Sequence, residues 1–501
     1  MPSSSSEALA DGSLPTPSTR TIFFTLYPSI MLPMFLAALD QTIVATALPA
    51  IAGSLGEVER VSWVVVSYLI ATTIAAPVYG RLGDVLGRKR MMLVALVIFI
   101  AASLFCAFAG SIVGLSLARV LQGLGGGGLM TLSQALIGES VPPRERGRFQ
   151  GYLAGVFMTA STFGPVAGGY LTQHFGWPSV FLVNVPVGLV AIGLALRLPR
   201  RPAGGGRLRF DFLGVLLFAA VVAPTLLALE QAQRFEARAL PGMIGLAGVA
   251  AAALWLLLRH ERRSKSPLLP IQLLSQAAIW RCDAMASCIG ATIVSLITFL
   301  PIYLQVVRGT GPGETGLLML PLTACIAVGS ICTGQLIART GRTAAIPSVG
   351  LGVVTVSLLA LAFLAPHLST RELPWAFGLT SITLGTGMPV VQITVQTVAG
   401  RKQLGAAAAS VQFSRSIGAA FGTALVGAVL FAVLAATDRH TAALFVTLVE
   451  RGPSALAALP QARQAIVQAE IGDAFRAALL TIACFAAGAV GLAWSLPMRR
   501  I

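Results

Sequence analysis

The feature that most constrains the fold of this chain is a series of apolar runs, each close to the length that crosses a bilayer. A membrane-spanning helix needs about 20 mostly apolar residues. Only 11% of the 501 residues are charged, whereas soluble domains carry about 25%. The sequence therefore predicts an all-α polytopic membrane protein. We expect fourteen spans, at 22–46, 61–79, 91–110, 112–136, 150–172, 179–197, 211–229, 241–258, 284–306, 315–338, 343–364, 374–396, 405–434 and 475–497.

The distribution of Lys and Arg predicts the orientation. The formal net charge is +16, which in a soluble chain would suggest a nucleic-acid partner. Most of the cations on the side that would be cytoplasmic with the N-terminus inside fall in 81–90, 144–148, 197–209 and 259–281. Cationic segments stay in the cytoplasm, so these positions predict a multi-pass protein of the plasma (inner) membrane with both termini cytoplasmic. The topology thus accounts for the positive charge, and the expected partner is the lipid bilayer and not a nucleic acid.

The runs predict four regions along the chain. Residues 1–20 are rich in Ser and Pro and are expected to be a disordered cytoplasmic tail. Residues 21–198 are expected to form one six-helix bundle and 284–501 a second, with an external loop at 435–474. The region 199–283 would be a linker with two additional transmembrane helices, which look like a lipid-facing insertion because their cores carry no charge.

Ionisable residues inside spans are costly and mark functional sites by default. We find three well inside the predicted spans: Asp40, Arg119 and Arg415. Asp40 and Arg119 both lie roughly 10 Å below the outer membrane edge, from 1.5 Å of rise per residue. This equal depth predicts a direct or water-mediated pair. The pair would serve proton coupling if the carboxylate can change its protonation state; a static pair that only fixes helix packing is the alternative.

Two further polar residues fall within one turn of each other in the span at 405–434. Gln412 precedes Arg415 by three residues, so both side chains lie on one helix face. They either line a central cavity or hold helices together.

The stretch from Gly80 to Arg90 predicts a tight, charged turn between two spans. Gly80, Gly83 and Gly87 tolerate the φ > 0 angles of such a turn. Asp84 lies among four cations, which favours an ion pair or a helix-end contact. A loop that only sets topology would explain the cations, but not the spacing of the glycines and the aspartate.

Glycines also cluster inside two spans. Gln122-Gly123 is followed by four more glycines up to Gly128, and the next span contains the pattern Gly155, Gly164-Pro165 and Gly168-Gly169. Small residues let helices approach closely, and an internal proline bends a helix. The patterns indicate either ordinary close packing or an interface that moves.

The cysteines and histidines exclude several functions. The six cysteines form no CxxC pair and are expected to be free thiols, and the four histidines fall in loops or at span ends. The sequence thus predicts neither a metal site nor a buried catalytic histidine, and we expect the protein not to be an enzyme.

These motifs resemble those of the major facilitator superfamily, in its fourteen-helix drug:proton antiporter branch (EmrB/QacA type). The matching stretches are Leu39 to Pro49, Gly80 to Arg90, Arg119-x-x-Gln122-Gly123, and Gly155 to Gly169. The likeness covers essentially the whole chain outside the tail. Ala45, Pro178 and Ala338 depart from the branch's usual residues.

The resemblance implies two six-helix bundles plus two extra central helices, and an efflux pump that works by alternating access. It assigns proton coupling to Asp40 and Arg119, and lining of the substrate cavity to Gln122, Gln412 and Arg415. The gating residues it implies are Gly80, Asp84, Gly87 and Arg88. The antiporter motif it implies consists of Gly155, Gly164, Pro165, Gly168 and Gly169.

The expected activity is export of amphipathic drugs or toxic compounds, with a proton gradient in place of any cofactor. With one acid deep in the membrane, neutral or monocationic substrates fit best. A dedicated exporter of a metabolite, siderophore or lipid is the alternative. In a double-membrane bacterium a periplasmic adaptor is a candidate partner.

Overall fold

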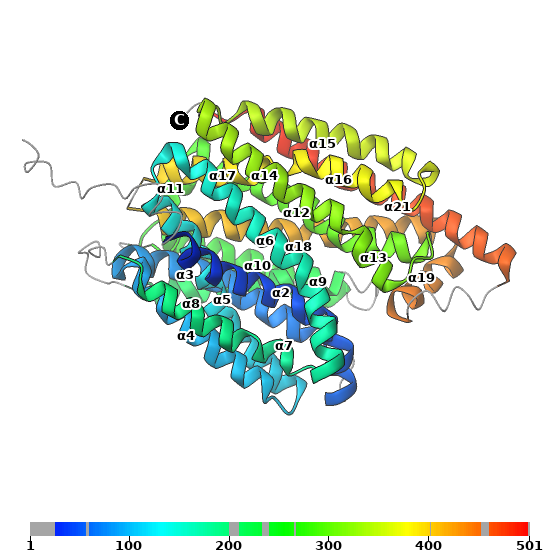
Figure 1. The fold of residues 1–501 in the computed structure, drawn as a ribbon, viewed down its shortest axis with the longest axis horizontal. Helices are drawn as coiled ribbons and strands as arrows, with labels where there is room; N and C mark the ends of the chain where they lie inside the picture. The colour runs from blue at the N-terminus through cyan, green and yellow to red at the C-terminus, as the bar shows by residue number, and fades with distance from the viewer. Residues whose placement is uncertain are drawn as a thin grey trace, which may run out of the picture.

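The computed structural model describes residues 26–56, 60–199, 210–232, 240–264, 267–400, 402–451 and 460–498. Within them the chain forms long helices that lie side by side and run roughly along one axis (Figure 1). The helices of the first part are α2 (Tyr27–Leu55), α3 (Trp63–Leu86), α4 (Arg88–Ala107), α5 (Ile112–Ser140), α6 (Pro143–Phe175), α7 (Ser179–Leu182) and α8 (Asn184–Leu196). A hairpin of α9 (Phe212–Ala232) and α10 (Leu240–Glu261) follows.

The second part begins with α11 (Ile271–Leu274) and α12 (Ala277–Val306). The helices after these are α13 (Pro312–Leu318), α14 (Leu320–Thr340), α15 (Ala345–Leu364), the 3₁₀ turn η5 (Ala365–His367), α16 (Glu372–Leu384), α17 (Gly387–Ala399), α18 (Leu404–Thr437), α19 (Arg439–Arg451) and α21 (Gln461–Trp494). Three predicted spans are thus each divided into two helical pieces, at Val183, Met319 and 385–386.

The all-α membrane fold is confirmed. In the described part of the chain, 13 helical segments are long and apolar enough to cross a bilayer. The remaining predicted span corresponds to α6, which is 33 residues long. It is less apolar than the others because its first turns contain the charged residues of 144–148.

Each of the two parts of the chain has its own apolar core. Helices α2–α8 enclose two clusters of buried side chains, centred on residues such as Phe99 and Phe181. Helices α12–α21 enclose one large cluster, to which α6 adds Met158. We call these two sets of helices the N-terminal half and the C-terminal half.

The hairpin α9–α10 is not purely lipid-facing, which corrects the expectation for these two helices. One face of α9 is buried, with Phe218, Val222 and Leu226 packed against side chains of α3 and α18. The ring centroids of Phe218 and Phe413 of α18 lie 5.1 Å apart, with the rings tilted by 55°. Helix α9 therefore covers the seam between the two halves, whereas α10 is mostly exposed.

The turn between α3 and α4 is shorter than predicted. Gly80 and Gly83 are helical, and Gly87 alone has positive φ (95°), where α3 ends and α4 begins. Gly80 lies against α18: a Cβ there would meet the Gly405 carbonyl oxygen at 2.5 Å. At Gly83 a Cβ would meet Leu132 of α5 at 2.7 Å. These two glycines allow close helix packing, and the turn predicted at them is wrong.

The segment predicted as an external loop at 435–474 is largely helical. Helix α18 continues to Thr437, α19 follows, and α21 begins at Gln461; residues 452–459 lie outside the described part. The connection is fixed by Asp438, which accepts a hydrogen bond from the Arg463 guanidinium at 2.5 Å. That bond, with others from the His440 amide and the Thr441 hydroxyl, lowers the pKa of Asp438 to about 2.

Candidate functional site

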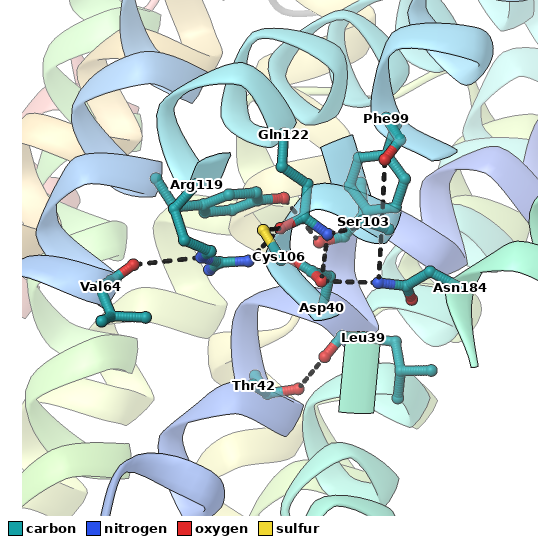
Figure 2. Close-up of polar contacts among 12 residues, drawn as sticks. Leu39, Asp40, Thr42, Val64, Phe99, Ser103, Cys106, Arg119, Gln122 and Asn184 are labelled. Atoms are coloured by element: carbon teal, nitrogen blue, oxygen red, sulfur yellow. Dashed lines mark hydrogen bonds and ion pairs between the residues drawn. The ribbon is translucent and has the colours of Figure 1, made fainter. Parts of the chain in front are cut away.

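The centre of the N-terminal half contains a buried ion pair between α2 and α5. Arg119 Nη1 lies 2.5 Å from Asp40 Oδ2, and the two side chains are 1% and 0% exposed. Both residues lie within apolar helices, so water cannot solvate them and each needs the other. The structure thus brings together the two charges that the sequence predicts at equal depth (Figure 2).

Three neutral side chains complete the environment of the Asp40 carboxylate. Gln122 Nε2 and Asn184 Nδ2 donate to Asp40 Oδ1 at 2.9 and 2.8 Å. Gln122 Nε2 also donates to Ser103 Oγ at 2.8 Å (Figure 2). The carboxylate therefore accepts hydrogen bonds from one cation and two amides.

Two of these partners were not predicted from the sequence. Asn184 begins α8 and Ser103 lies inside α4, and both are fully buried. A single Asn or Ser in an apolar run gives only a weak signal, because such residues usually bond to their own helix. The one clue was that buried polar side chains need partners.

Contacts with α3 also hold the side chain of Arg119 in place. Its Nε donates to the Val64 carbonyl at 3.1 Å, and its guanidinium lies 4.0 Å from the ring centroid of Tyr68. Tyr68 in turn donates to the Ala37 carbonyl at 3.3 Å. The guanidinium is thus held by contacts with Asp40, Val64 and Tyr68.

A cavity of about 580 Å³ lies between the two halves. This volume is in the usual range of sites for drug-sized molecules. Its wall contains polar groups such as Arg119, Gln134, Gln412 and Arg415 among many apolar side chains, and α9 contributes Leu226, Leu229 and Glu230. The hairpin α9–α10 thus supplies part of the cavity wall.

The predicted cavity residues do not all reach this cavity. Gln412 and Arg415 of α18 line it. Gln122 does not: it is 0% exposed and bonded within the Asp40 cluster, which corrects the expectation for that residue. Its position on α5 turns its side chain toward α4 and α2, where the buried carboxylate needs a donor.

A second charge cluster joins the two halves where α3 meets α4. Arg88 bonds to Asp84 and to Glu139, each at 2.6 Å. Asp84 also accepts hydrogen bonds from the backbone amides of Gly405 (3.1 Å) and Ala406 (3.4 Å) at the start of α18. A carboxylate at a helix N-terminus is favourable. We call this contact between Asp84 and the start of α18 the latch.

The glycines of the predicted antiporter motif face several helices. Gly164 and Gly168 lie against Thr42 and Ile43 of α2, so they pack within the N-terminal half. They do not form the moving interface between halves that was one interpretation of the sequence. Gly155 faces Ile331 of the C-terminal half. A Cβ at Gly169 would meet nothing within 4 Å, and Pro165 lines the cavity.

The glycine run of α5 likewise packs within one half. A Cβ at Gly123 or Gly127 would meet the backbone of α3 at 2.7 or 2.3 Å, and one at Gly125 would meet α4 at 2.8 Å. These glycines therefore serve close packing inside the N-terminal half and do not form a moving interface.

Acids within long helices were also missed in the sequence analysis, among them Glu230 of α9 and Asp283. Asp283 lies in α12, which begins at Ala277 and not, as predicted, at 284. It accepts a hydrogen bond from Ser410 Oγ at 3.2 Å. Among the described residues no group of three or more His, Cys, Asp or Glu could hold a metal ion, and all six cysteines are free thiols.

Two helical halves around a central cavity are the arrangement found in many membrane transporters. The family model for the Major Facilitator Superfamily matches residues 30–423. The chain belongs to the Major Facilitator Superfamily.

Relatives and solved structures agree with this assignment. The chain is 34% identical over 423 residues to an uncharacterized MFS-type transporter of Mycobacterium tuberculosis, in an alignment of 84% of this chain and 61% of that protein. It therefore spans less than two thirds of that relative's length. It is 32% identical to the multidrug transporter protein MdtP of Bacillus subtilis, over 82% of this chain and 76% of MdtP.

The fold is similar to that of the proton:xylose symporter XylE. The TM-score is 0.62 at 14% identity, and the match covers 95% of this chain and 96% of XylE. At this identity the similarity concerns the fold alone. The family model and the alignment to MdtP together place the chain in a superfamily of membrane transporters.

Proposed function

We propose that the protein is a proton-coupled antiporter of the plasma (inner) membrane that exports amphipathic compounds by alternating access. The observation that carries the proposal is the buried Asp40–Arg119 pair, of which Arg119 lines the cavity. A carboxylate in such a place can exchange a proton only when its surroundings change.

The surroundings of Asp40 favour coupling over a purely static role. Arg119 lines the cavity, whereas Asp40 lies behind it. A substrate in the cavity therefore meets Arg119 first, and any movement of the guanidinium removes the charge that stabilises the Asp40 carboxylate. In this mechanism Asp40 binds a proton from outside and releases it to the cytoplasm, while the substrate travels in the opposite direction.

The latch supplies the gate. Asp84 binds the start of α18 from the other half, and Arg88 holds Asp84 in place together with Glu139. On the expected orientation this contact closes the cytoplasmic end of the cavity. Opening toward the cytoplasm requires Asp84 to release the two backbone amides.

The test is transport into everted membrane vesicles that carry an imposed pH gradient. A panel of amphipathic compounds is offered to wild-type vesicles, to Asp40→Asn vesicles and to vesicles without the protein. The matched control is Asp283→Asn, which changes an acid in a long helix of the other half. We expect the wild type and Asp283→Asn to accumulate at least one compound, in a manner abolished when the gradient is collapsed.

The Asp40→Asn variant, present at equal amounts, is expected to lose at least 90% of this accumulation. Accumulation that persists in Asp40→Asn, or that ignores the gradient in the wild type, would refute proton coupling through Asp40.

A further inference from the structure

The charged side chains on the cavity wall do not all have a charged partner within ion-pair distance among the described residues. Within the described part of the chain, three side chains of charged residue types line the cavity: Arg119, Glu230 and Arg415. Arg119 is neutralised by Asp40 at 2.5 Å. Glu230 lies near the beginning of α3, where its Oε1 accepts a hydrogen bond from Ser62 Oγ at 3.2 Å. Arg415 remains to be explained.

The contacts of Arg415 carry no negative charge. Its Nη2 donates to Gln412 Oε1 at 3.2 Å, and its guanidinium lies 4.9 Å from the ring centroid of Phe157 on α6. Among the residues that the structure describes, no carboxylate lies within ion-pair distance of it. A cation inside the membrane is costly without a counter-ion, so either water or a bound molecule must stabilise it.

We propose that Arg415 is the recognition group for an anionic amphipathic substrate, such as a lipophilic carboxylate or sulfonate. The planar guanidinium donates paired hydrogen bonds to a carboxylate or sulfonate, which makes it the best cation in proteins for such a group. The inference rests on the proposed function, because it takes the cavity as the substrate site, and it replaces the sequence-based preference for neutral or monocationic compounds.

The rest of the wall suits the apolar body of such a molecule. Near Arg415 the wall is formed by side chains of both halves, including Phe157, Met158, Ile289 and Ile293. Arg415 itself bridges the halves, since it belongs to α18 and stacks on a ring of α6. A substrate anion at this point would therefore contact both halves at once, as alternating access requires.

The alternative is that Arg415 only holds α18 against α6. In that case its replacement would lower stability without changing the preference for one sign of charge. The two readings are separated by a pair of probes that share one body and differ in charge: 2-naphthalenesulfonate and (2-naphthyl)trimethylammonium.

The experiment measures equilibrium binding of both probes to the purified full-length protein by isothermal titration calorimetry in a non-ionic detergent, with detergent alone as blank. The variants are Arg415→Gln, which keeps a hydrogen-bonding side chain, and Arg415→Lys, which keeps the charge. The control is Arg259→Gln. It also removes one cation stacked on an aromatic ring, here Trp255 at 5.4 Å, but on the exposed helix α10.

We expect the wild type and Arg259→Gln to bind the sulfonate at least tenfold more tightly than the ammonium probe. Arg415→Gln should lose at least tenfold in sulfonate affinity and none in ammonium affinity. Arg415→Lys should retain a preference for the sulfonate. If Arg415→Gln does not fold, a wild type that prefers the ammonium probe or binds both probes equally still overturns the inference.

A wild-type preference for the ammonium probe, equal affinities, or the absence of binding by both probes would overturn the inference. So would an unchanged sulfonate preference in Arg415→Gln. These results leave the proposed function standing if gradient-driven export still depends on Asp40. Conversely, loss of that dependence refutes the proposed function without altering the binding preference.

Discussion

Replacing Asp84 with Asn should open the latch. Asp84 accepts hydrogen bonds from the backbone amides of Gly405 and Ala406 at the N-terminus of α18. A negative charge in a partly buried position of this kind stabilises the contact by up to about 2 kcal/mol. Loss of that amount changes the ratio of closed to open latch by roughly thirtyfold. Arg88 keeps Glu139 as a partner at 2.6 Å, so the variant leaves no isolated buried cation.

The open fraction can be measured as the rate at which a buried cysteine is alkylated. Ala408 is 0% exposed and packs with Ala135 across the two halves, so a cysteine at 408 reacts only when the halves separate. When opening is fast, the alkylation rate follows the open population. The background replaces the four cysteines that are not fully buried: Cys288, Cys325, Cys332 and Cys484.

We expect N-ethylmaleimide to modify A408C about thirtyfold faster when Asp84→Asn is present, by the population ratio above. The matched control is Asp473→Asn, which removes an exposed pair with Arg476 within α21 and should leave the rate unchanged. An Asp84→Asn rate within threefold of the parent would refute the argument that the charge on Asp84 holds the halves together.

Three further predictions follow from the packing and the charges. Gly80→Val should separate α3 from α18, because even a Cβ would lie 2.5 Å from the Gly405 oxygen; alkylation of A408C should rise, whereas Gly169→Ala should have no effect. Asn184→Ala removes a donor to Asp40 and should cost about 1–3 kcal/mol, seen as a lower melting temperature; an unchanged value would contradict this cost. The lowered pKa of Asp438 means that its contribution to folding stability is complete above its ordinary pKa of 3.8 and is lost toward pH 2. The rate of hydrogen exchange in α19, corrected for intrinsic rates, should therefore be constant from about pH 8 to 5. A change of that rate within this window would contradict the prediction.

The fold could be predicted from the sequence because bilayer thickness dictates the length of the apolar runs. Each predicted apolar run corresponds to a helix or to a pair of helices. The sequence did not predict the breaks that divide some runs into two helices, as at Val183 and Met319. Asp40 and Arg119 could be found because charges are rare in such runs. The same reasoning missed Asp283, since helix α12 begins seven residues before the predicted span.

Packing directions could not be predicted, because they depend on tertiary contacts. The sequence predicts that Gly80 and Gly83 belong to the turn, which is wrong: both are helical, and they pack closely against α18 and Leu132. Gln122 was expected in the cavity, but its side chain is needed by Asp40. The burial of α9 follows from the seam between the halves, which no single run of residues reveals.

The central claim is that Asp40 carries the proton that is exchanged for substrate. It is tested most directly by proton release from purified protein in weakly buffered solution, when a compound that the wild type exports is added. The account predicts proton release by the wild type. It predicts none by Asp40→Asn, even though this variant still binds the compound. Equal proton release by both proteins would contradict it.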